Sequence, residues 1–521
     1  MMGAVRHSTP TRGESEDPVR IPSALALALL AVVVPAAIPL AESQRLSEAS
    51  NDVLGGLDPD QWLALARDVS DTLLDAGPDR YGNVDTPLWV GVIDPATHRL
   101  IKQKPANFMV YWDAEDYVMT AQGCNLYRDM PALGALCRLS DITGDVKYRD
   151  AVEAYLKFYL QECPSKTTGL LPAGEHMSYN CVRDRINAKR HEMEHNPPGW
   201  PLLWAVHPEA VQRAIEAIYN CHVYDKEQFF YDRHGAYYTG EFDPMPVRGT
   251  YIKHSGLYAY SFLFLYSKTR DPEHLDWAHG IADLYWSRRD PRTNLVPGYV
   301  SPGGIQDTTR TQLLLAYYLL DAAKFDPDPF FIGRGLGMVD SYLKYGFNAE
   351  RATFAQSLNI KTGEVAIPTA DTRWTTAESA AFYEVLAVWK AYEVTGKEEY
   401  LDVVCACLRH TAEVPLPDNL DPYTAAQWLE LYLDAYGAAH DREFMHRART
   451  LAAWTAHHLV RNKVILESAD GCVYHNTTRP GALLAAWLRL YTVEMAEPLH
   501  ARDCRVSLAW STLGTCAGRC R

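Results

Sequence analysis

One pattern recurs along this chain and limits its fold more than any other feature. An apolar helical segment ends at a tight turn, and a second amphipathic segment begins within a few residues. The turn holds glycine or a small polar residue, which ends the first helix, and an acidic residue near the start of the second. Each copy is therefore a predicted αα-hairpin. The copies occupy residues 129–160, Leu265–Trp286, Ala391–His410 and Leu431–Leu459.

Helical spacing of apolar residues also appears between and around these copies. The further predicted helices are Asp60–Leu74, Pro208–His222, His254–Tyr266, Thr308–Ala323, Pro329–Tyr345, Thr375–Val394, Pro422–Ala435 and Pro480–Val493. Repeated helix hairpins bury their apolar faces only against neighbours, so they form an open solenoid or a closed ring. Irregular repeat lengths and long decorated loops favour the ring. The sequence thus predicts an all-α (α/α) toroid of about six helical hairpins.

The ends of the chain differ from this helical part. Residues 1–43 contain the apolar run Ile21–Leu40 and read as a signal peptide or an N-terminal anchor. We expect one catalytic domain at 44–499, and an irregular tail at 500–521 that lacks the helical periodicity. The protein is then secreted or periplasmic, and any contact with a membrane is through the N-terminal anchor.

Charge and aromatic content narrow the class of ligand. The formal net charge of −15 argues against nucleic acid as a partner, because such binders carry a basic excess or a basic face. The chain has 13 Trp and 31 Tyr, and aromatic rings suit stacking on the apolar faces of sugars. A polysaccharide or oligosaccharide is the expected substrate. The predicted stacking platform is Trp112, Trp200 and Trp204.

The hairpin turns also carry a family resemblance. TGDVKYRDA, TRDPEHLDWA and TGKEEYLDV resemble the turns of six-hairpin glycosidase-like (α/α) toroids. That superfamily includes glycoside hydrolases, unsaturated uronyl hydrolases, polysaccharide lyases and sugar epimerases, so the resemblance implies a carbohydrate-processing enzyme. The stretch at residues 202–238 additionally resembles secreted bacterial proteins described as pectate-lyase-like.

Candidate catalytic groups concentrate between His191 and Tyr238. His222, Arg233 and His234 combine a group that moves protons near neutral pH with a guanidinium that binds a carboxylate through two hydrogen bonds. Elimination next to a uronate carboxylate needs both functions. His254, at the start of a predicted helix, and His195 complete the predicted catalytic set. Helix capping and plain ion pairing are the structural alternatives for His222 and Arg233.

Three further groups of residues bear on substrate binding or on other chemistry. Asp113, Asp307 and Arg310 are predicted to bind substrate, although Asp307 equally suits a helix N-cap. A hydrolase would need two carboxylates, drawn from Asp113, Glu192, Glu194, Asp307 and Glu378, and no spacing selects a pair. The segment 191–195 matches the H-E-x-x-H zinc motif, but the following Pro-Pro argues against the helix this motif requires.

These observations predict an exported polysaccharide lyase that cleaves a uronate-containing glycan by β-elimination, with His222 or His234 as base and Arg233 and Arg310 holding the carboxylate. The alternatives are a glycoside hydrolase on the same toroid and a non-catalytic glycan-binding solenoid. An acidic chain binding a polyanion needs a local basic loop or a bridging Ca²⁺, and the sequence leaves the cofactor open.

Overall fold

The computed structural model describes residues 57–101, 121–174, 177–187, 190–193, 199–242, 250–301, 304–367, 381–412, 416 and 419–500. The chain divides into two compact units, and all of these residues belong to the second, Leu54–Arg521. The predicted signal peptide or anchor, most of the predicted tail, and Trp112, Asp113 and His195 lie outside the described residues.

Helices dominate the described part of this unit. They are α2 (Pro59–Ala76), α3 (Leu126–Thr143), α4 (Lys147–Glu162), α5 (Trp200–Val206), α6 (Pro208–His222), α7 (Ile252–Thr269), α8 (Pro272–Trp286), α9 (Thr311–Asp321), α10 (Pro329–Gly346), α11 (Ala381–Thr395), α12 (Glu398–Ala412), α13 (Pro422–Ala439), α14 (Arg442–His458) and α15 (Pro480–His500), with short 3₁₀ turns at Ala322–Lys324 and Asn476–Thr478.

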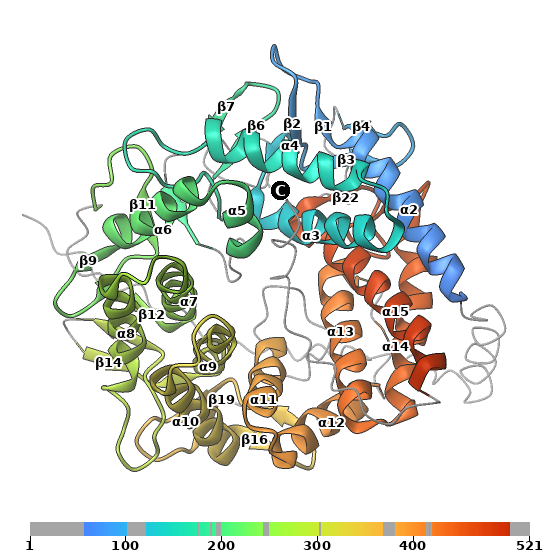
Figure 1. Cartoon of the computed structure of the whole chain (residues 1–521). Helices are drawn as coiled ribbons and strands as arrows, with labels where there is room; N and C mark the ends of the chain where they lie inside the picture. The colour runs from blue at the N-terminus through green and yellow to red at the C-terminus, as the bar shows by residue number, and fades with distance from the viewer. Residues whose placement is uncertain are drawn as a thin grey trace, which may run out of the picture. The chain divides into compact units, whose positions relative to one another are not determined.

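These helices are arranged as a ring of hairpins (Figure 1). Helices α7, α9 and α11 pack side by side, as do α13, α15 and α3, while α8, α10, α12, α14 and α4 pack against their hairpin partners. Helix α15 also packs against α2, so the last described helix joins the first two and closes the ring. Six pairs consist of helices of 11 residues or more, and α5, with 7 residues, forms a shorter pair with α6. The predicted toroid of about six hairpins is confirmed.

The predicted turns close the hairpins for the expected stereochemical reason. Gly144 ends α3 and Gly396 follows α11, both with positive φ, the left-handed conformation in which glycine carries no Cβ penalty. Arg270 and His440 take the same role after α7 and α13 at φ values of 57° and 54°. The next helix then begins at an aspartate side-chain cap in α8 and α14.

Short strands decorate the loops of the toroid, and in the described part they form nine sheets of two or three strands. The strands are β1 (Pro78–Asp79), β2 (Thr86–Trp89), β3 (Val92–Asp94), β4 (Arg99–Leu100), β5 (Gly123–Cys124), β6 (Ser178–Asn180), β7 (Arg185–Asn187), β8 (Arg190–Glu192), β9 (Val223–Asp225), β10 (Phe230–Tyr231), β11 (His234–Ala236), β12 (Thr250–Tyr251), β13 (Tyr299–Ser301), β14 (Gly304–Gln306), β15 (Thr308–Thr309), β16 (Phe347–Asn348), β17 (Thr353–Phe354), β18 (Ser357–Leu358), β19 (Val365–Ile367), β20 (Val460–Arg461), β21 (Val464–Ile465) and β22 (Tyr474–His475).

The strands change two local predictions. The helix expected from Thr308 begins only at Thr311, because Thr308 and Thr309 pair with β18 as strand β15. The H-E-x-x-H segment begins as strand β8, so its described part has no helix on which two histidines could share a face.

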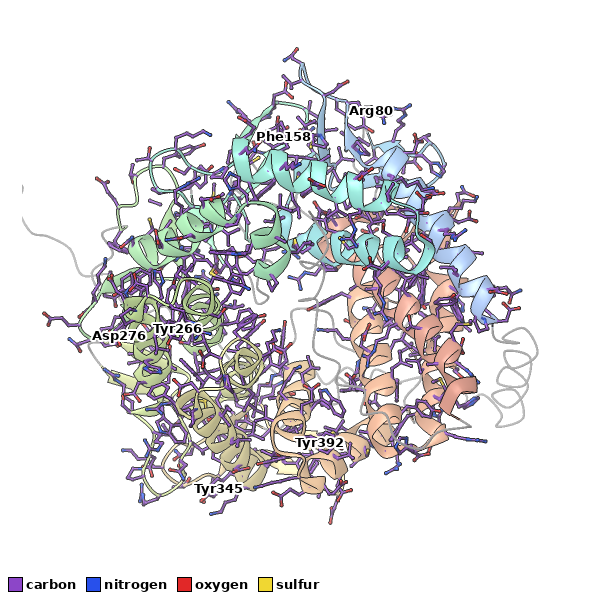
Figure 2. The ribbon with its side chains drawn as sticks, in the orientation of Figure 1. Arg80, Phe158, Tyr266, Asp276, Tyr345 and Tyr392 are labelled. Atoms are coloured by element: carbon purple, nitrogen blue, oxygen red, sulfur yellow. The ribbon has the colours of Figure 1, made fainter. Side chains whose placement is uncertain are left out.

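The core lies between the helix layers and is rich in aromatic residues. Its largest fully buried side chains include Trp62, Trp89 and Trp487. Phe158 on α4 and Tyr266 on α7, both labelled in Figure 2, are partly buried and pack against this core from the outer and inner layers. The packed helices of the ring thus carry the loops and short strands that connect them.

Candidate functional site

Strands β8 and β11 bring two distant parts of the chain into register. Glu192 lies directly opposite His234, and His191 lies opposite Gly235. Because side chains alternate between the two faces of a strand, Glu192 and His234 share one face of this two-stranded sheet, and His191 points to the other face. The two-stranded sheet of β8 and β11 thus carries a carboxylate–imidazole pair on one face and a second imidazole on the other face.

The carboxylate of Glu192 is the centre of this arrangement. Its side chain is 1% exposed, and its Oε2 lies 3.0 Å from Nε2 of His234. Its Oε1 lies 3.4 Å from Nη1 of Arg233 and 3.7 Å from Nε2 of His254, which stands at the start of α7. We call these four residues the Glu192 cluster. A buried carboxylate is stable only when it is paired in this way, so the Arg233 guanidinium and the two imidazoles hold it in place.

Exposure differs sharply within the Glu192 cluster. Glu192 and His254 are each 1% exposed, whereas the side chain of His234 is 19% exposed and that of Arg233 is 38% exposed. Arg233 and His234 are therefore the members that a bound molecule can reach first, and Glu192 and His254 support them from beneath.

A pair of histidines, His191 and His222, lies on the other face of the sheet of β8 and β11. His222 ends α6, and its Nε2 lies 2.7 Å from Nδ1 of His191. Its Nδ1 lies 2.9 Å from the carbonyl oxygen of Asp232 and 3.1 Å from the hydroxyl of Tyr258. A carbonyl can only accept, so Nδ1 of His222 carries the proton, and its Nε2 accepts from Nδ1–H of His191.

Burial keeps both of these histidines neutral. It lowers the pKa of His222 to about 3, with the nearby His234 adding to the shift, and lowers that of His191 well below its ordinary value. His222 is fully buried and hydrogen-bonded through both ring nitrogens. The prediction that His222 acts as the base is wrong, because it has no nitrogen positioned to meet a substrate; it is a positioning residue.

Two glycines allow the close packing on which this geometry depends. A Cβ atom on Gly235 would lie 2.7 Å from Nε2 of His222, so the histidine ring rests directly on the bare backbone of β11. Gly174 has a φ of +112° and pairs with Glu192 as an isolated bridge, and a Cβ there would lie 1.4 Å from the Glu192 carbonyl oxygen. Only glycine satisfies both the space and the backbone conformation at position 174.

A second polar pair lies where α9 and α11 begin. Nε of Arg310 is 3.5 Å from Oε1 of Glu384, which is almost fully buried. Burial raises the pKa of Glu384 to about 8, and Arg310 offsets only part of that rise. Arg310 is thus placed against Glu384. Asp307 is exposed and its Oδ1 accepts from the backbone N–H of Ile360, so the alternative that it caps a helix is wrong.

The two described tryptophans of the predicted platform differ. Trp200 is 1% exposed, and its indole N–H donates to the hydroxyl of Ser261 at 2.8 Å. The prediction that Trp200 stacks on sugar is wrong, because its ring faces are enclosed by the core. Trp204 is partly exposed and packs edge-on against Phe264, with ring centroids 5.9 Å apart, so its role as a platform stays a prediction.

Sequence reasoning found His222, Arg233, His234 and His254, and the structure brings all four to one place. The sequence marks Glu192 only as one of five carboxylates for a hydrolase and as part of the zinc motif. No pattern within residues 190–192 or 234–236 singles it out, because its position follows from the pairing of β8 with β11.

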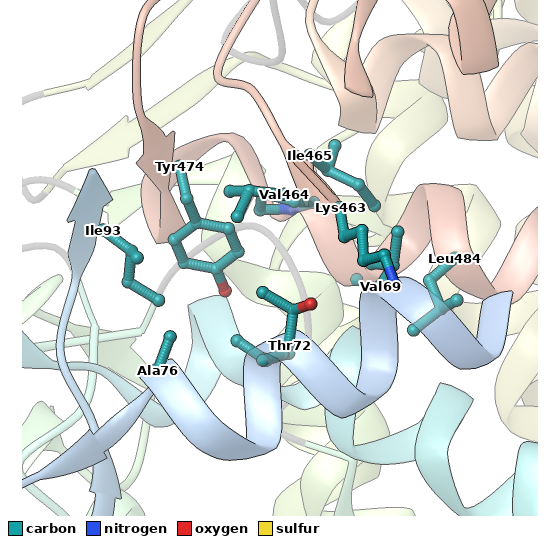
Figure 3. A pocket seen from close by; sticks show the side chains of 12 residues that line it. Val69, Thr72, Ala76, Ile93, Lys463, Val464, Ile465, Tyr474 and Leu484 are labelled. Atoms are coloured by element: carbon teal, nitrogen blue, oxygen red, sulfur yellow. The ribbon is translucent and has the colours of Figure 1, made fainter. Parts of the chain in front are cut away.

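Other hollows bear on where a ligand can bind. Figure 3 shows one between α2, β21, β22 and α15, lined by Val69, Ile93, Ile465 and other mostly apolar groups. Its volume of about 20 Å³ is on the scale of a single water molecule, so it is not a substrate site. Within the described ranges, no group of three or more His, Cys, Asp or Glu is arranged to hold a metal ion. Nor does any helix of those ranges have the length and apolarity to cross a membrane.

Comparison with known proteins agrees with a role in carbohydrate chemistry. The model of the periplasmic pectate lyase family matches residues 103–302, the stretch that contains the Glu192 cluster. Distant structural likenesses include the GH76 alpha-mannanase of Bacteroides thetaiotaomicron, at 11% identity over 86% of this chain and 99% of that chain, with a TM-score of 0.46.

A second is the cellobiose 2-epimerase of Bacillus thermoamylovorans, at 11% identity over 82% of this chain and 99% of that chain, with a TM-score of 0.45. A third is an unsaturated glucuronyl hydrolase specific for heparin, at 12% identity over 84% of this chain and 98% of that chain, with a TM-score of 0.44. The match to the periplasmic pectate lyase family supports a carbohydrate-active enzyme.

Proposed function

We propose that this protein is a polysaccharide lyase that cleaves a uronate-containing glycan by β-elimination at the Glu192 cluster. The observation that carries the proposal is that a half-exposed guanidinium, Arg233, and an imidazole, His234, both lie against the buried carboxylate of Glu192 where β11 begins. The match of residues 103–302 to the periplasmic pectate lyase family supports the same substrate class.

In the proposed reaction His234 acts as the base. It removes the proton from the carbon next to the uronate carboxylate, the bond from the neighbouring carbon to the glycosidic oxygen breaks, and a carbon–carbon double bond forms between the two ring carbons. The leaving oxygen takes up a proton to become a hydroxyl. No water is added, so the atoms of the polymer are divided between two products.

The neighbours of His234 suit this role. Glu192 lies at Nε2 of His234, which places the proton of the neutral ring on that nitrogen and leaves Nδ1 as the basic one. The carboxylate then stabilises the imidazolium that forms when His234 takes the substrate proton. Arg233 binds the uronate carboxylate, on which negative charge grows in the transition state. The hydrogen bond between His191 and His222 supports the sheet of β8 and β11 from its opposite face.

Digestion of a panel of uronate polymers tests the reaction. Elimination yields an unsaturated uronate that absorbs ultraviolet light and a product one water lighter than the hydrolytic one. Hydrolysis yields a new reducing end without the chromophore and would replace this proposal with a glycoside hydrolase. Binding without any cleavage would favour a non-catalytic glycan-binding protein. Parallel assays with a chelator test the Ca²⁺ bridge suggested by the acidic chain.

Variants with matched controls test the residues. His234→Ala should lower kcat by about 10²- to 10⁴-fold, the usual contribution of a general base. His279→Ala is its control, since His279 also pairs with a carboxylate, Asp328, at 2.8 Å but lies on α8 outside the Glu192 cluster. Unchanged kcat in His234→Ala, with the control behaving identically, would contradict the assignment of the base.

The guanidinium has its own test. Arg233→Lys keeps the charge but removes the planar fork, so we expect kcat/KM to fall by about 10-fold or more. Arg334→Lys, at an ion pair with Asp283 of 2.7 Å on the outer helices, is the matched control. Equal activity of the two variants would show that Arg233 does not bind the substrate carboxylate.

A further inference from the structure

A polar pocket lies between the end of α4, the turn that follows it, and α6. Its volume is about 320 Å³, at the small end of the range for ligand sites in proteins. The turn at residues 164–169 forms one side, and Arg213 and Asn220 of α6 line the other. Nothing in the proposed reaction uses this pocket.

Two cations line the pocket in a chain whose net charge is −15. Lys166 is exposed and donates one of its three ammonium hydrogens to the carbonyl oxygen of Gln161. Arg213 is exposed, and its side chain has no hydrogen bond or ion pair with any residue that the structure describes. Glu216 is the one acidic residue among the described residues that line the pocket. It accepts from Gln212 at 2.8 Å and lies 3.8 Å from Nε2 of His274, so its charge already has partners.

The pocket is also preformed. The backbone N–H of Gly169 donates to the carbonyl oxygen of Ser165 at 2.9 Å, and Oγ of Ser165 accepts from the N–H of Thr168 at 3.1 Å. Gly169 has a φ of +87°, and a Cβ there would lie 3.3 Å from the carbonyl oxygen of Arg213, so the turn packs closely on α6. The hydroxyl of Thr168 donates to the carbonyl oxygen of Tyr237, which ties the turn to the chain just after β11.

We propose that this pocket is an accessory binding site for an anionic sugar unit of the polymer. The fork of Arg213 suits a carboxylate, Lys166 adds a point charge, and the amide of Asn220 and the hydroxyl of Thr167 can bind sugar hydroxyls. The choice of a uronate as that unit rests on the proposed function. Arg213 and His222 lie on the same helix about 14 Å apart along its axis, so one long polymer is a ligand common to both regions.

Affinity electrophoresis of the full chain in gels containing polygalacturonate measures this binding directly. We expect the double variant Lys166→Ala/Arg213→Ala to bind the polymer at least about tenfold more weakly, because two charge-assisted contacts are lost. Lys157→Ala is the matched control, because it removes a lysine of α4 that pairs with Glu153 and does not line the pocket. Circular dichroism and thermal melting establish that each variant is folded.

Two further gels identify the ligand. Fully methyl-esterified polygalacturonate should retard the native protein and the double variant equally, because it lacks the carboxylates. Inorganic sulfate at the concentration of the uronate units should not abolish the difference between native protein and double variant in the unesterified gel. Equal retardation of the two proteins by polygalacturonate, a difference that persists with the ester, or full competition by sulfate would each overturn the proposal.

Kinetics separate this inference from the proposed reaction. The double variant should keep the native kcat on a galacturonate trimer and show a raised KM only on the polymer. If no uronate yields an unsaturated product but the double variant still loses retardation, the proposed reaction falls and the binding site stands. If elimination occurs and the double variant binds and reacts like the native protein, the binding site falls alone.

Discussion

Replacing Gly174 by alanine is the most direct test of the geometry around Glu192. The added Cβ would lie 1.4 Å from the carbonyl oxygen of Glu192, and Cβ atoms essentially never come within 3.0 Å of another heavy atom. The two backbones must therefore separate by at least about 1.6 Å. Alanine at a φ of +112° adds about 1–3 kcal/mol of backbone strain.

A shift of this size reaches the reacting groups because Glu192 holds His234 and Arg233. A misplacement of about 1 Å in a catalytic arrangement costs about 10²-fold in rate, so kcat/KM of Gly174→Ala should fall by at least that factor. The assay is the rise of ultraviolet absorbance on a uronate polymer, together with urea unfolding to record the loss of stability.

The control is Gly333→Ala in α10, where an added Cβ meets no atom within 4 Å. A glycine in a helix is less favourable than alanine by roughly 0.5–1 kcal/mol, so this variant should be slightly more stable and fully active. Gly174→Ala with native kcat/KM and native stability would refute the link between this glycine, Glu192 and the reaction.

Three other predictions concern buried groups. Because the folded pKa of His222 is about 3, the unfolded chain takes up its proton first as pH falls from 6.5 towards 3; the free energy of unfolding then falls by about 1.4 kcal/mol per pH unit. His222→Asn should lower the slope by about that amount in urea titrations at pH 6, 5 and 4, leaving the separate contribution of His191. An unchanged slope contradicts a neutral buried His222. For Glu384 the pH dependence has the opposite sign. Its pKa of about 8 makes its contribution to the free energy of unfolding complete below pH 4.5 and lost as pH rises through 8. The melting temperature of Glu384→Gln minus that of the native protein should therefore be larger at pH 8 than at pH 5. Gly235→Ala should cost about 1–3 kcal/mol in urea unfolding, because its Cβ displaces His222; a cost below about 0.5 kcal/mol would mean that the ring moves freely.

Most of the fold could be predicted from local sequence patterns. The helix predicted at Pro208–His222 has those bounds in the structure, because proline suits the first helical turn and the apolar spacing stops where β9 begins. The turns at Gly144 and Gly396 were readable for a similar reason, since a left-handed residue after a helix has few alternatives to glycine. These features depend on residues within one or two turns of each other.

The errors depend on contacts that are distant in sequence. Thr308 continues a helical pattern but pairs with Leu358, 50 residues further along, and this pairing overrides the local preference. Trp200 follows the turn-forming residues Pro197, Pro198 and Gly199, and its burial involves a partner 61 residues further along the chain, Ser261. Glu192 became the centre of the candidate site only through its register with His234 on β11, which no local pattern announces.

The contact of α15 with α2 and α3 bears on how the chain folds during synthesis. Helices α2 and α3 emerge early, but the partner that covers their remaining apolar side is made last. Until Pro480–His500 leaves the ribosome, the nascent protein is an arc with two bare edges rather than a circle. A chain cut short before Pro480 would keep those edges exposed, and they would bind the same edges of other copies. We therefore expect such a chain to aggregate rather than to form a smaller stable fold.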